Sequence, residues 1–237
     1  MIRVALDTAS DRLALALERP GSAPVAEFVD GSRRHASQLL PALDRLLARL
    51  RATAIDIDEV IVADGPGSFT GLRVGATVAK ALVASRGVRL WRAPALLARA
   101  LAAAAPDGSV VVGVSDALRG ELFAGAWRIS SSGISLVLEP LARTPAALRA
   151  ALPTPDAVAG SVPGPLRPEL RDWAPQLQLD QPADARALLT LVGRPGGAEL
   201  VVDPAAWEPV YGRPAEAQAR WEAAHGRSLP HSTGAHR

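Results

Sequence analysis

The 237-residue sequence contains no cysteine at all. A chain without thiols can form no disulfide framework, no thiolate zinc site and no cysteine nucleophile. Aromatic residues make up only 4% of the sequence, so a stacking platform for single-stranded nucleic acid is not expected. Because 49% of the residues are hydrophobic, the chain can still build a core, and the disordered, collagen-like and coiled-coil classes are excluded.

Lysine is almost absent: Lys80 is the only one among the 26 basic residues, which face 24 acidic ones. The net charge of +2 is small, and the sequence pI near 9.8 follows from the very high pKa of arginine. Adjacent basic residues occur only at Arg33 and Arg34. This charge distribution does not indicate a nucleic-acid surface.

Long hydrophobic runs are missing as well. The most apolar stretch, residues 95–105, carries Arg99 and is too short to span a bilayer. Asp7, Asp11 and Arg12 interrupt the N-terminus before the apolar core of a signal peptide could form. We therefore expect no membrane contact and a cytoplasmic location.

The first hundred residues predict strands that alternate with helices. The leucines between Leu39 and Leu50 recur at spacings of three and four, as on an amphipathic helix, and Pro41 is expected in its first turn or at a bend. The alternating and apolar segments indicate a mixed sheet with helical crossovers. We expect strands near 2–6, 13–17, 24–29, 59–63 and 88–92, and helices near 39–50, 70–85 and 94–104.

The second half begins by repeating the first. Residues 110–115 lead into Asp116 and an alternating segment at 121–129, just as residues 2–6 lead into Asp7 and a hairpin. Such a duplication predicts two lobes built from similar halves, although chance could produce the same pattern. Ten of the 20 prolines lie between Pro153 and Pro209, so the second lobe is expected to be reduced.

The domain limits follow from these patterns. In the second lobe we expect one helix near 184–192 and one strand near 199–202, and past Arg213 a short helix and a frayed tail. The predicted units are an N-terminal lobe at 1–106, a reduced C-terminal lobe at 107–213 and a terminal helix and tail at 214–237.

The densest motif is the glycine-rich run at residues 64–75, between a predicted strand and a predicted helix. One interpretation is a phosphate cradle, since free backbone amides and the helix dipole would face the turn. However, the run lacks the Gly-Lys-Ser/Thr ending of a P-loop and the glycine spacing of a dinucleotide fingerprint. The other interpretation is a tight turn with Ser68 or Thr70 as the helix cap.

The helix after this run carries small residues at steps of four, namely Gly71, Gly75 and Ala79. One side should pack on the sheet, and the remaining apolar surface predicts a helical subunit interface together with the leucine-rich helix. The candidate interface residues are Leu39, Leu43, Leu46, Leu47, Leu50, Gly71, Leu72, Gly75, Val78, Ala79 and Leu82.

Few residues could carry chemistry. Asp7, Thr8 and Asp116 could form a weak nucleotide site, but each aspartate could equally close its hairpin as an Asx turn. No two of the four histidines lie four residues apart, so a helical histidine clamp for a metal is absent. His35, before the leucine-rich helix, is expected to cap the helix or face solvent, and no nucleophile-elbow motif supports a triad built on it.

Together these motifs resemble the TsaB (YeaZ) family. The most specific part is the run at residues 65–75, which continues to Ala84; Leu6-Asp7-Thr8-Ala9 and His35-Ala36-Ser37-Gln38-Leu39-Leu40-Pro41 also match. Further matches are Asp116-Ala117 with Glu121-Leu122-Phe123, and Pro209-Val210-Tyr211-Gly212-Arg213. The resemblance spans about residues 1–213 in the right order, and Gly212 departs from it where bulkier residues are common.

The resemblance implies an actin-like and Hsp70-like (ASKHA) α/β fold with two lobes and duplicated mixed sheets. It also implies a role in making threonylcarbamoyladenosine on tRNAs that read codons beginning with adenine. The catalyst in that family is the paralogue TsaD, to which TsaB-like proteins bind through the N-terminal lobe. An ATPase, TsaE, joins the bacterial complex, and tRNA is expected to reach this chain through the complex.

The resemblance further implies that this chain is not itself an enzyme. The catalytic paralogue holds its metal with paired histidines on the helix after the glycine-rich run, where this sequence reads Arg92-Ala93-Pro94-Ala95-Leu96-Leu97-Ala98-Arg99-Ala100. We expect no cofactor on this chain, with ATP and metal on partner subunits. The alternatives are an ATP-using phosphotransferase built on Asp7, Thr8 and Asp116, and a homodimer formed when the partner is absent.

Overall fold

The computed structural model describes residues 1–31 and 34–212, so the helix and tail expected after Arg213 lie outside the described residues. The first sheet has six strands in the order β11-β5-β4-β1-β2-β3. The antiparallel meander β1–β3 arises because polar turns separate three alternating segments, and β4 and β5 then add in parallel. The strands are β1 (Ile2–Asp7), β2 (Arg12–Glu18), β3 (Val25–Asp30), β4 (Ile57–Ala63), β5 (Arg89–Ala93) and β11 (Glu199–Leu200).

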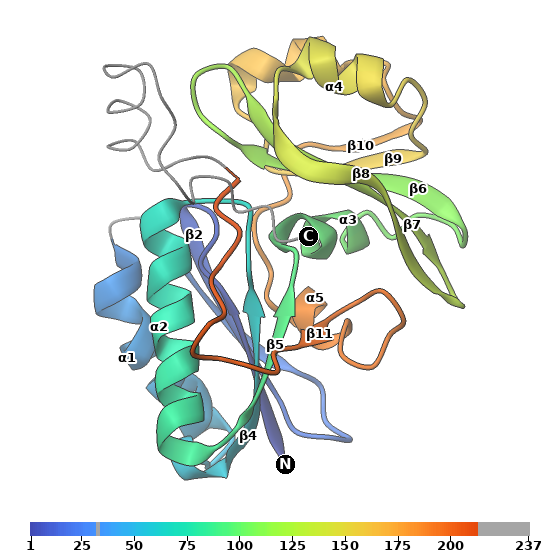
Figure 1. Cartoon of the computed structure of the whole chain (residues 1–237). Coiled ribbons are helices and arrows are strands. Elements are labelled where there is room, and N and C mark those ends of the chain that lie inside the picture. The colour runs from blue at the N-terminus through green and yellow to red at the C-terminus, as the bar shows by residue number, and fades with distance from the viewer. Residues whose placement is uncertain (32–33, 213–237) are drawn as a thin grey trace.

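Two helices, α1 (His35–Arg49) and α2 (Phe69–Arg86), cover one face of this sheet (Figure 1). The short η2 (Ala54–Asp56) leads from α1 into β4. On the other face lies α3 (Ala95–Leu101), which also packs against the second sheet and thereby joins the two lobes. The helix α1 begins earlier than expected, so Pro41 lies inside it rather than in its first turn.

The second sheet repeats the first. Its order, β10-β9-β6-β7-β8, matches β5-β4-β1-β2-β3 strand for strand, with an antiparallel meander followed by two parallel additions. Its strands are β6 (Ser109–Asp116), β7 (Leu122–Ser130), β8 (Gly133–Arg143), β9 (Ala157–Gly160) and β10 (Gln176–Gln178). This topology confirms the predicted two-lobed α/β fold with duplicated mixed sheets.

The second lobe is reduced in its helices rather than in its strands. The crossover that corresponds to the 15-residue α1 is the seven-residue α4 (Pro145–Ala151), and the one that corresponds to the 18-residue α2 is a seven-residue 3₁₀ segment, η3 (Gly164–Leu170). Pro168 lies inside that segment, and its missing N–H and fixed φ disfavour a longer α-helix. The proline content predicts this reduction, but the sequence patterns do not predict β8, β9 or β10.

The last described elements return to the first lobe, which corrects their predicted placement. The helix α5 (Arg186–Leu189) is shorter than the helix expected at 184–192, and it packs against β1, β2 and β4. The strand β11 pairs with β5, although residues 199–202 were expected in the second lobe. Periodicity predicts an element but not its neighbour, which explains the error. Within the described residues, no helix is both long and apolar enough to cross a membrane.

Candidate functional site

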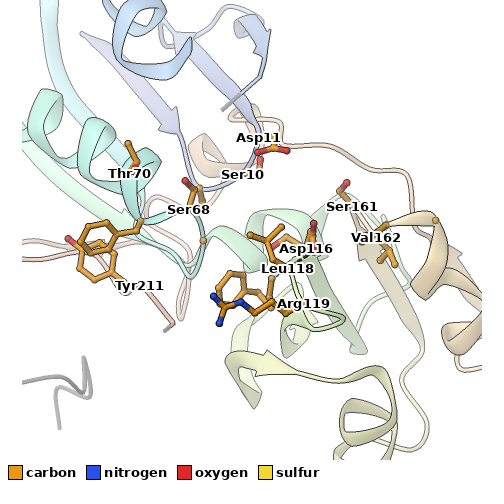
Figure 2. A pocket seen from close by; sticks show the side chains of 18 of the residues that line it. Ser10, Asp11, Ser68, Thr70, Asp116, Leu118, Arg119, Ser161, Val162 and Tyr211 are labelled. Atoms are coloured by element: carbon orange, nitrogen blue, oxygen red, sulfur yellow. Dashed lines mark hydrogen bonds between the residues drawn. The ribbon is translucent and has the colours of Figure 1, made fainter. Parts of the chain in front are cut away.

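A cleft of about 880 Å³ lies between the lobes. The first lobe lines it with residues 9–11, residues 67–70 and Tyr211, and the second with residues 115–119 and 161–164. Figure 2 shows Asp116, Leu118 and Arg119 reaching into the cleft across from Ser68. Hydroxyl groups, carboxylates, arginines and aromatic rings all line this space, so it can accept a polar ligand.

The two duplicated aspartates make the same local turn. The Oδ1 of Asp7 accepts a hydrogen bond from the Ala9 amide at 3.0 Å, and the Oδ1 of Asp116 accepts one from the Leu118 amide at 2.7 Å. Both are Asx turns that begin the hairpin between the first two strands of their lobe. The duplicated strand–Asp–hairpin pattern is therefore confirmed in the structure.

The environments of the two aspartates differ sharply. Asp7 is fully buried, and its Oδ2 accepts a hydrogen bond from Nη1 of Arg99 on α3 at 2.6 Å. Asp116 is exposed and lines the cleft. Both oxygens of Asp7 are thus committed within the protein, whereas Asp116 keeps an oxygen toward the cleft. Of the predicted nucleotide-site residues, Asp116 alone lines this cleft, because Thr8 is also fully buried.

The glycine-rich run packs against the first of these turns. A Cβ at Gly67 would overlap the carbonyl oxygen of Ala9, and one at Gly71 would overlap the carbonyl oxygen of Thr8. The Ser68 amide donates to Ala9 O at 2.7 Å, and Ser68 Oγ accepts from the Gly71 amide, which confirms Ser68 as the helix cap. Because internal partners occupy these amides, the geometry supports the tight turn over the phosphate cradle.

This packing corrects the predicted subunit interface. A Cβ at Gly75 would lie 2.5 Å from Thr8 Oγ1, so the small-residue stripe fits α2 onto its own lobe and does not receive a second helix. Most of the other candidate interface residues are likewise buried in the core of their own lobe. They are Leu39, Leu43, Leu46, Leu47, Gly71, Leu72 and Ala79. Only Leu50, Val78 and Leu82 are partly exposed.

The outward face of α1 and α2 has a different composition. Leu40 of α1 is 55% exposed, and Thr77 and Ala81 of α2 are also exposed. Val74 and Val78 are half-buried beside them. We call these five residues the outer helix face. Most of the residues predicted for the interface therefore face the chain's own core, because burial in that core and burial by a partner produce the same apolar pattern.

A C-terminal segment, residues 201–212, runs beside α2, and we call it the strap (Figure 1). Trp207 is 9% exposed and packs in the core between α2 and the sheet. Nζ of Lys80 lies 5.8 Å from the Trp207 ring centre and contacts Glu208 at 3.4 Å. The only lysine of the sequence is therefore held by the strap.

The end of the strap reaches the cleft. The ring of Tyr211 lies 4.6 Å from that of Phe69, centre to centre, and the Arg73 guanidinium covers Phe69 at 4.2 Å. A Cβ at Gly212 would lie 2.5 Å from Pro66 of the first lobe and 2.8 Å from Phe123 of the second. The strap therefore ends wedged between the two lobes.

His35 does not face solvent as expected. It is 2% exposed, and neither ring nitrogen has a hydrogen-bond partner among the described residues. In the same residues, no group of three or more histidine, aspartate or glutamate side chains could hold a metal ion.

Comparison with known proteins places these features in a family. The model for TsaD, tRNA N6-adenosine threonylcarbamoyltransferase, matches residues 29–154. The tRNA threonylcarbamoyladenosine biosynthesis protein TsaB of Bacillus subtilis (strain 168) is 30% identical over 139 residues, which cover 58% of this chain and 60% of that protein. TsaB of Escherichia coli (strain K12) is 29% identical over 132 residues, which cover 55% and 57%. The alignments thus span less than two thirds of these curated relatives.

Solved structures show the same fold. A crystal structure of an uncharacterized protein from Pseudomonas aeruginosa, described as similar to peptidase YEAZ, has a TM-score of 0.75 at 23% identity and covers 90% of this chain and 99% of that one. YeaZ from Pseudomonas aeruginosa gives 0.68 at 23% identity, over 81% and 90%. These similarities support the ASKHA-like architecture. The matched family model and the curated relatives together show that the chain belongs to the TsaB (YeaZ) family.

Proposed function

We propose that this chain is a non-catalytic partner subunit in the synthesis of threonylcarbamoyladenosine on tRNA, and that it pairs with a TsaD-like transferase. The names of the two curated TsaB relatives support the pathway. The family model for the TsaD transferase matches residues 29–154, which supports a paralogous relationship between this chain and its partner.

The observation that carries the proposed pairing is the outer helix face. Between Arg73 and Arg86, α2 has a single charged residue, Lys80, and the strap holds that charge. Thr77 and Ala81 are small and exposed, so a partner helix can approach α2 closely at these positions. Each buried Å² of apolar surface would contribute about 25 cal/mol before association costs.

The non-catalytic role is supported by the packing of α3, whose side chains are buried in the core between the lobes. By the resemblance, the metal-binding histidines of TsaD fall on the helix that follows β5, which is α3 here. In this chain Leu96, Leu97, Ala98 and Ala100 of that helix are buried in the core between the lobes, and Arg99 holds Asp7. The helix therefore joins the lobes by packing and by one ion pair.

The pairing is tested by placing a charge on the outer helix face. Ala81→Arg should weaken binding to the TsaD-like protein of the same organism at least tenfold in isothermal titration calorimetry, because the guanidinium would be desolvated at a helix contact. Ala150→Arg is the matched control, since Ala150 is exposed on α4 of the second lobe. Equal affinities for both variants would contradict this interface.

The same helix face would also determine how the subunits assemble. In the absence of the transferase, the outer helix face would pair with a second copy of the chain, and the partner would compete with that homodimer. A TsaE-like ATPase would join the complex, ATP and metal would reside on the partner subunits, and tRNA would be bound through the complex.

A second candidate, an ATP-using phosphotransferase, is favoured by the 880 Å³ cleft and by the exposed carboxylate of Asp116 within it. It predicts micromolar ATP binding by the isolated chain, which Asp116→Ala would abolish. Asp7 cannot bind a nucleotide without losing its ion pair with Arg99. Because this leaves the phosphotransferase without one of its two aspartates, we favour the partner-subunit proposal. The absence of ATP binding at millimolar nucleotide would eliminate the alternative.

A further inference from the structure

A second and smaller cavity, of about 130 Å³, lies where β4, β5, β11, the strap and β8 meet. Asp64, directly after β4, forms its inner wall and is 5% exposed. Val210 of the strap and Pro140 of β8 form other walls, so the cavity is bounded by both lobes. None of these residues has a part in the proposed pairing or in the large cleft.

The strap is hydrogen-bonded to the backbone of Asp64. Its carbonyl oxygen accepts a hydrogen bond from the Val210 amide at 2.7 Å, and its amide donates to Ala93 O at 3.0 Å. The carbonyl oxygen of Val210 occupies the space that a Cβ would need at Gly65, the next residue. Val210 is therefore packed tightly against the backbone of Asp64 and Gly65, on the strap side of the cavity.

The charges around Asp64 are poorly balanced. Arg92 of β5 places Nη1 3.4 Å from Asp64 Oδ2 and Nη2 2.6 Å from Glu199 Oε2, so one guanidinium serves two carboxylates. The shorter contact goes to Glu199, whose side chain is 68% exposed. Burial therefore dominates at Asp64 and, together with the charge of Glu199, raises the pKa of Asp64 to about 7 against the attraction of Arg92.

We propose that Asp64, Arg92 and Glu199 form a proton-controlled latch for the strap, which holds residues 201–212 against α2 and between the lobes while Asp64 is protonated and releases them when Asp64 ionises. Protonated Asp64 is a neutral group that the cavity tolerates. Ionised Asp64 must gain water or a full share of Arg92. Val210 borders the same cavity and is bonded to the Asp64 carbonyl oxygen, so it is the part of the strap that such a rearrangement would move. The strap contacts α2 at Lys80 and lies between the lobes at Gly212. Its release would therefore affect both the surface of α2 and the contact between the lobes.

Amide hydrogen exchange of peptides that cover residues 201–212 tests the latch in the full chain. Between pH 5 and 7 the opening equilibrium should rise by up to about tenfold per pH unit and level off above pH 7, because the open state releases the proton more readily than the closed state. Asp64→Asn should remove this rise. The chemical pH dependence of exchange is the same in both proteins, so the ratio of their rates reports opening alone.

A milder variant keeps the test decisive if Asp64→Asn does not fold. Glu199→Gln removes the competing carboxylate at an exposed site. The opening equilibrium of the strap should therefore level off at a lower pH than in the wild type. Peptides from β6 and β7 are the internal control and should show no such shift. Two results would overturn the latch. One is the same pH dependence of strap exchange in wild type and Asp64→Asn, and the other is a plateau at the same pH in Glu199→Gln as in wild type.

Discussion

Asp7 and Arg99 form a buried ion pair of 2.6 Å that joins the end of the first strand to the helix between the lobes, and neither side chain is more than 3% exposed. The corresponding aspartate of the second lobe, Asp116, makes the same turn but is exposed and lines the cleft. The pair thus marks where the two copies of the fold have diverged, since one aspartate became structural and the other faces the cleft.

Removing Arg99 should destabilise the protein strongly. Arg99→Met would leave the Asp7 carboxylate buried without a cation, at a cost of about 3–5 kcal/mol in the free energy of unfolding. The double variant Asp7→Asn with Arg99→Met should recover part of that loss, which urea unfolding can measure. As a control, Asp30→Asn breaks the exposed pair with Arg12 and should change stability much less. A small effect of Arg99→Met would contradict the structural role of the pair.

The contact between α2 and the first hairpin predicts a second result. Gly75→Ala should lower the free energy of unfolding by about 1–3 kcal/mol through overpacking against Thr8 Oγ1. Thr8→Ala in the same chain should relieve the clash, since that hydroxyl has no hydrogen-bond partner in the described residues. Gly164→Ala is the matched control because its Cβ would meet open space. If both alanine variants cost the same, Gly75 does not make the proposed close contact.

Asp64 should give the stability of the protein a particular pH dependence. Its pKa is raised to about 7 by burial, whereas an unfolded aspartate titrates near 3.8, so the folded state binds the proton more tightly. The associated stability is complete below pH 3.8 and is lost as pH rises to about 7, on the order of 2–4 kcal/mol in total. Asp64→Asn should therefore gain stability relative to wild type between pH 4.5 and 8. A constant difference over that range in urea unfolding would refute this.

The strap should contribute to the stability of the first lobe. Trp207→Ala should cost about 3–5 kcal/mol, because it empties a site in the core beneath α2. Trp207→Phe should cost much less, since the buried Nε1 has no hydrogen-bond partner in the described residues and its removal breaks no bond. Thermal unfolding of the two variants measures this, and a small loss in Trp207→Ala would contradict the packing role of the strap.

Local signals in the sequence predicted the first lobe well and the second poorly. The strands around Asp7, the stripe of leucines after His35 and the cap at Ser68 all correspond to elements of the structure, because each has a periodicity or a turn of its own. Strands β9 and β10 have only four and three residues and lack such patterns. The duplication at Asp116 could have predicted them, since the order of the second sheet copies the first.

The candidate site was harder to predict, because burial does not say what covers a residue. Gly71, Gly75 and Ala79 lie on one helical face, as expected, yet that face packs on Thr8. Arg99 entered the sequence analysis only as an interruption of an apolar run, and no local pattern links it to Asp7, 92 positions away. The strap was equally hidden, because its contacts with Lys80 and Arg73 join residues more than a hundred positions apart.

The central claim, that this chain acts through a TsaD-like partner bound at the outer helix face, is tested most directly by measuring mass in solution. Light scattering during gel filtration should show a one-to-one complex when the chain is mixed with the TsaD-like protein of its own organism, and Ala81→Arg should prevent that complex while Ala150→Arg should not. Two proteins that elute separately at micromolar concentrations, or a complex that forms equally well with Ala81→Arg, would contradict the account.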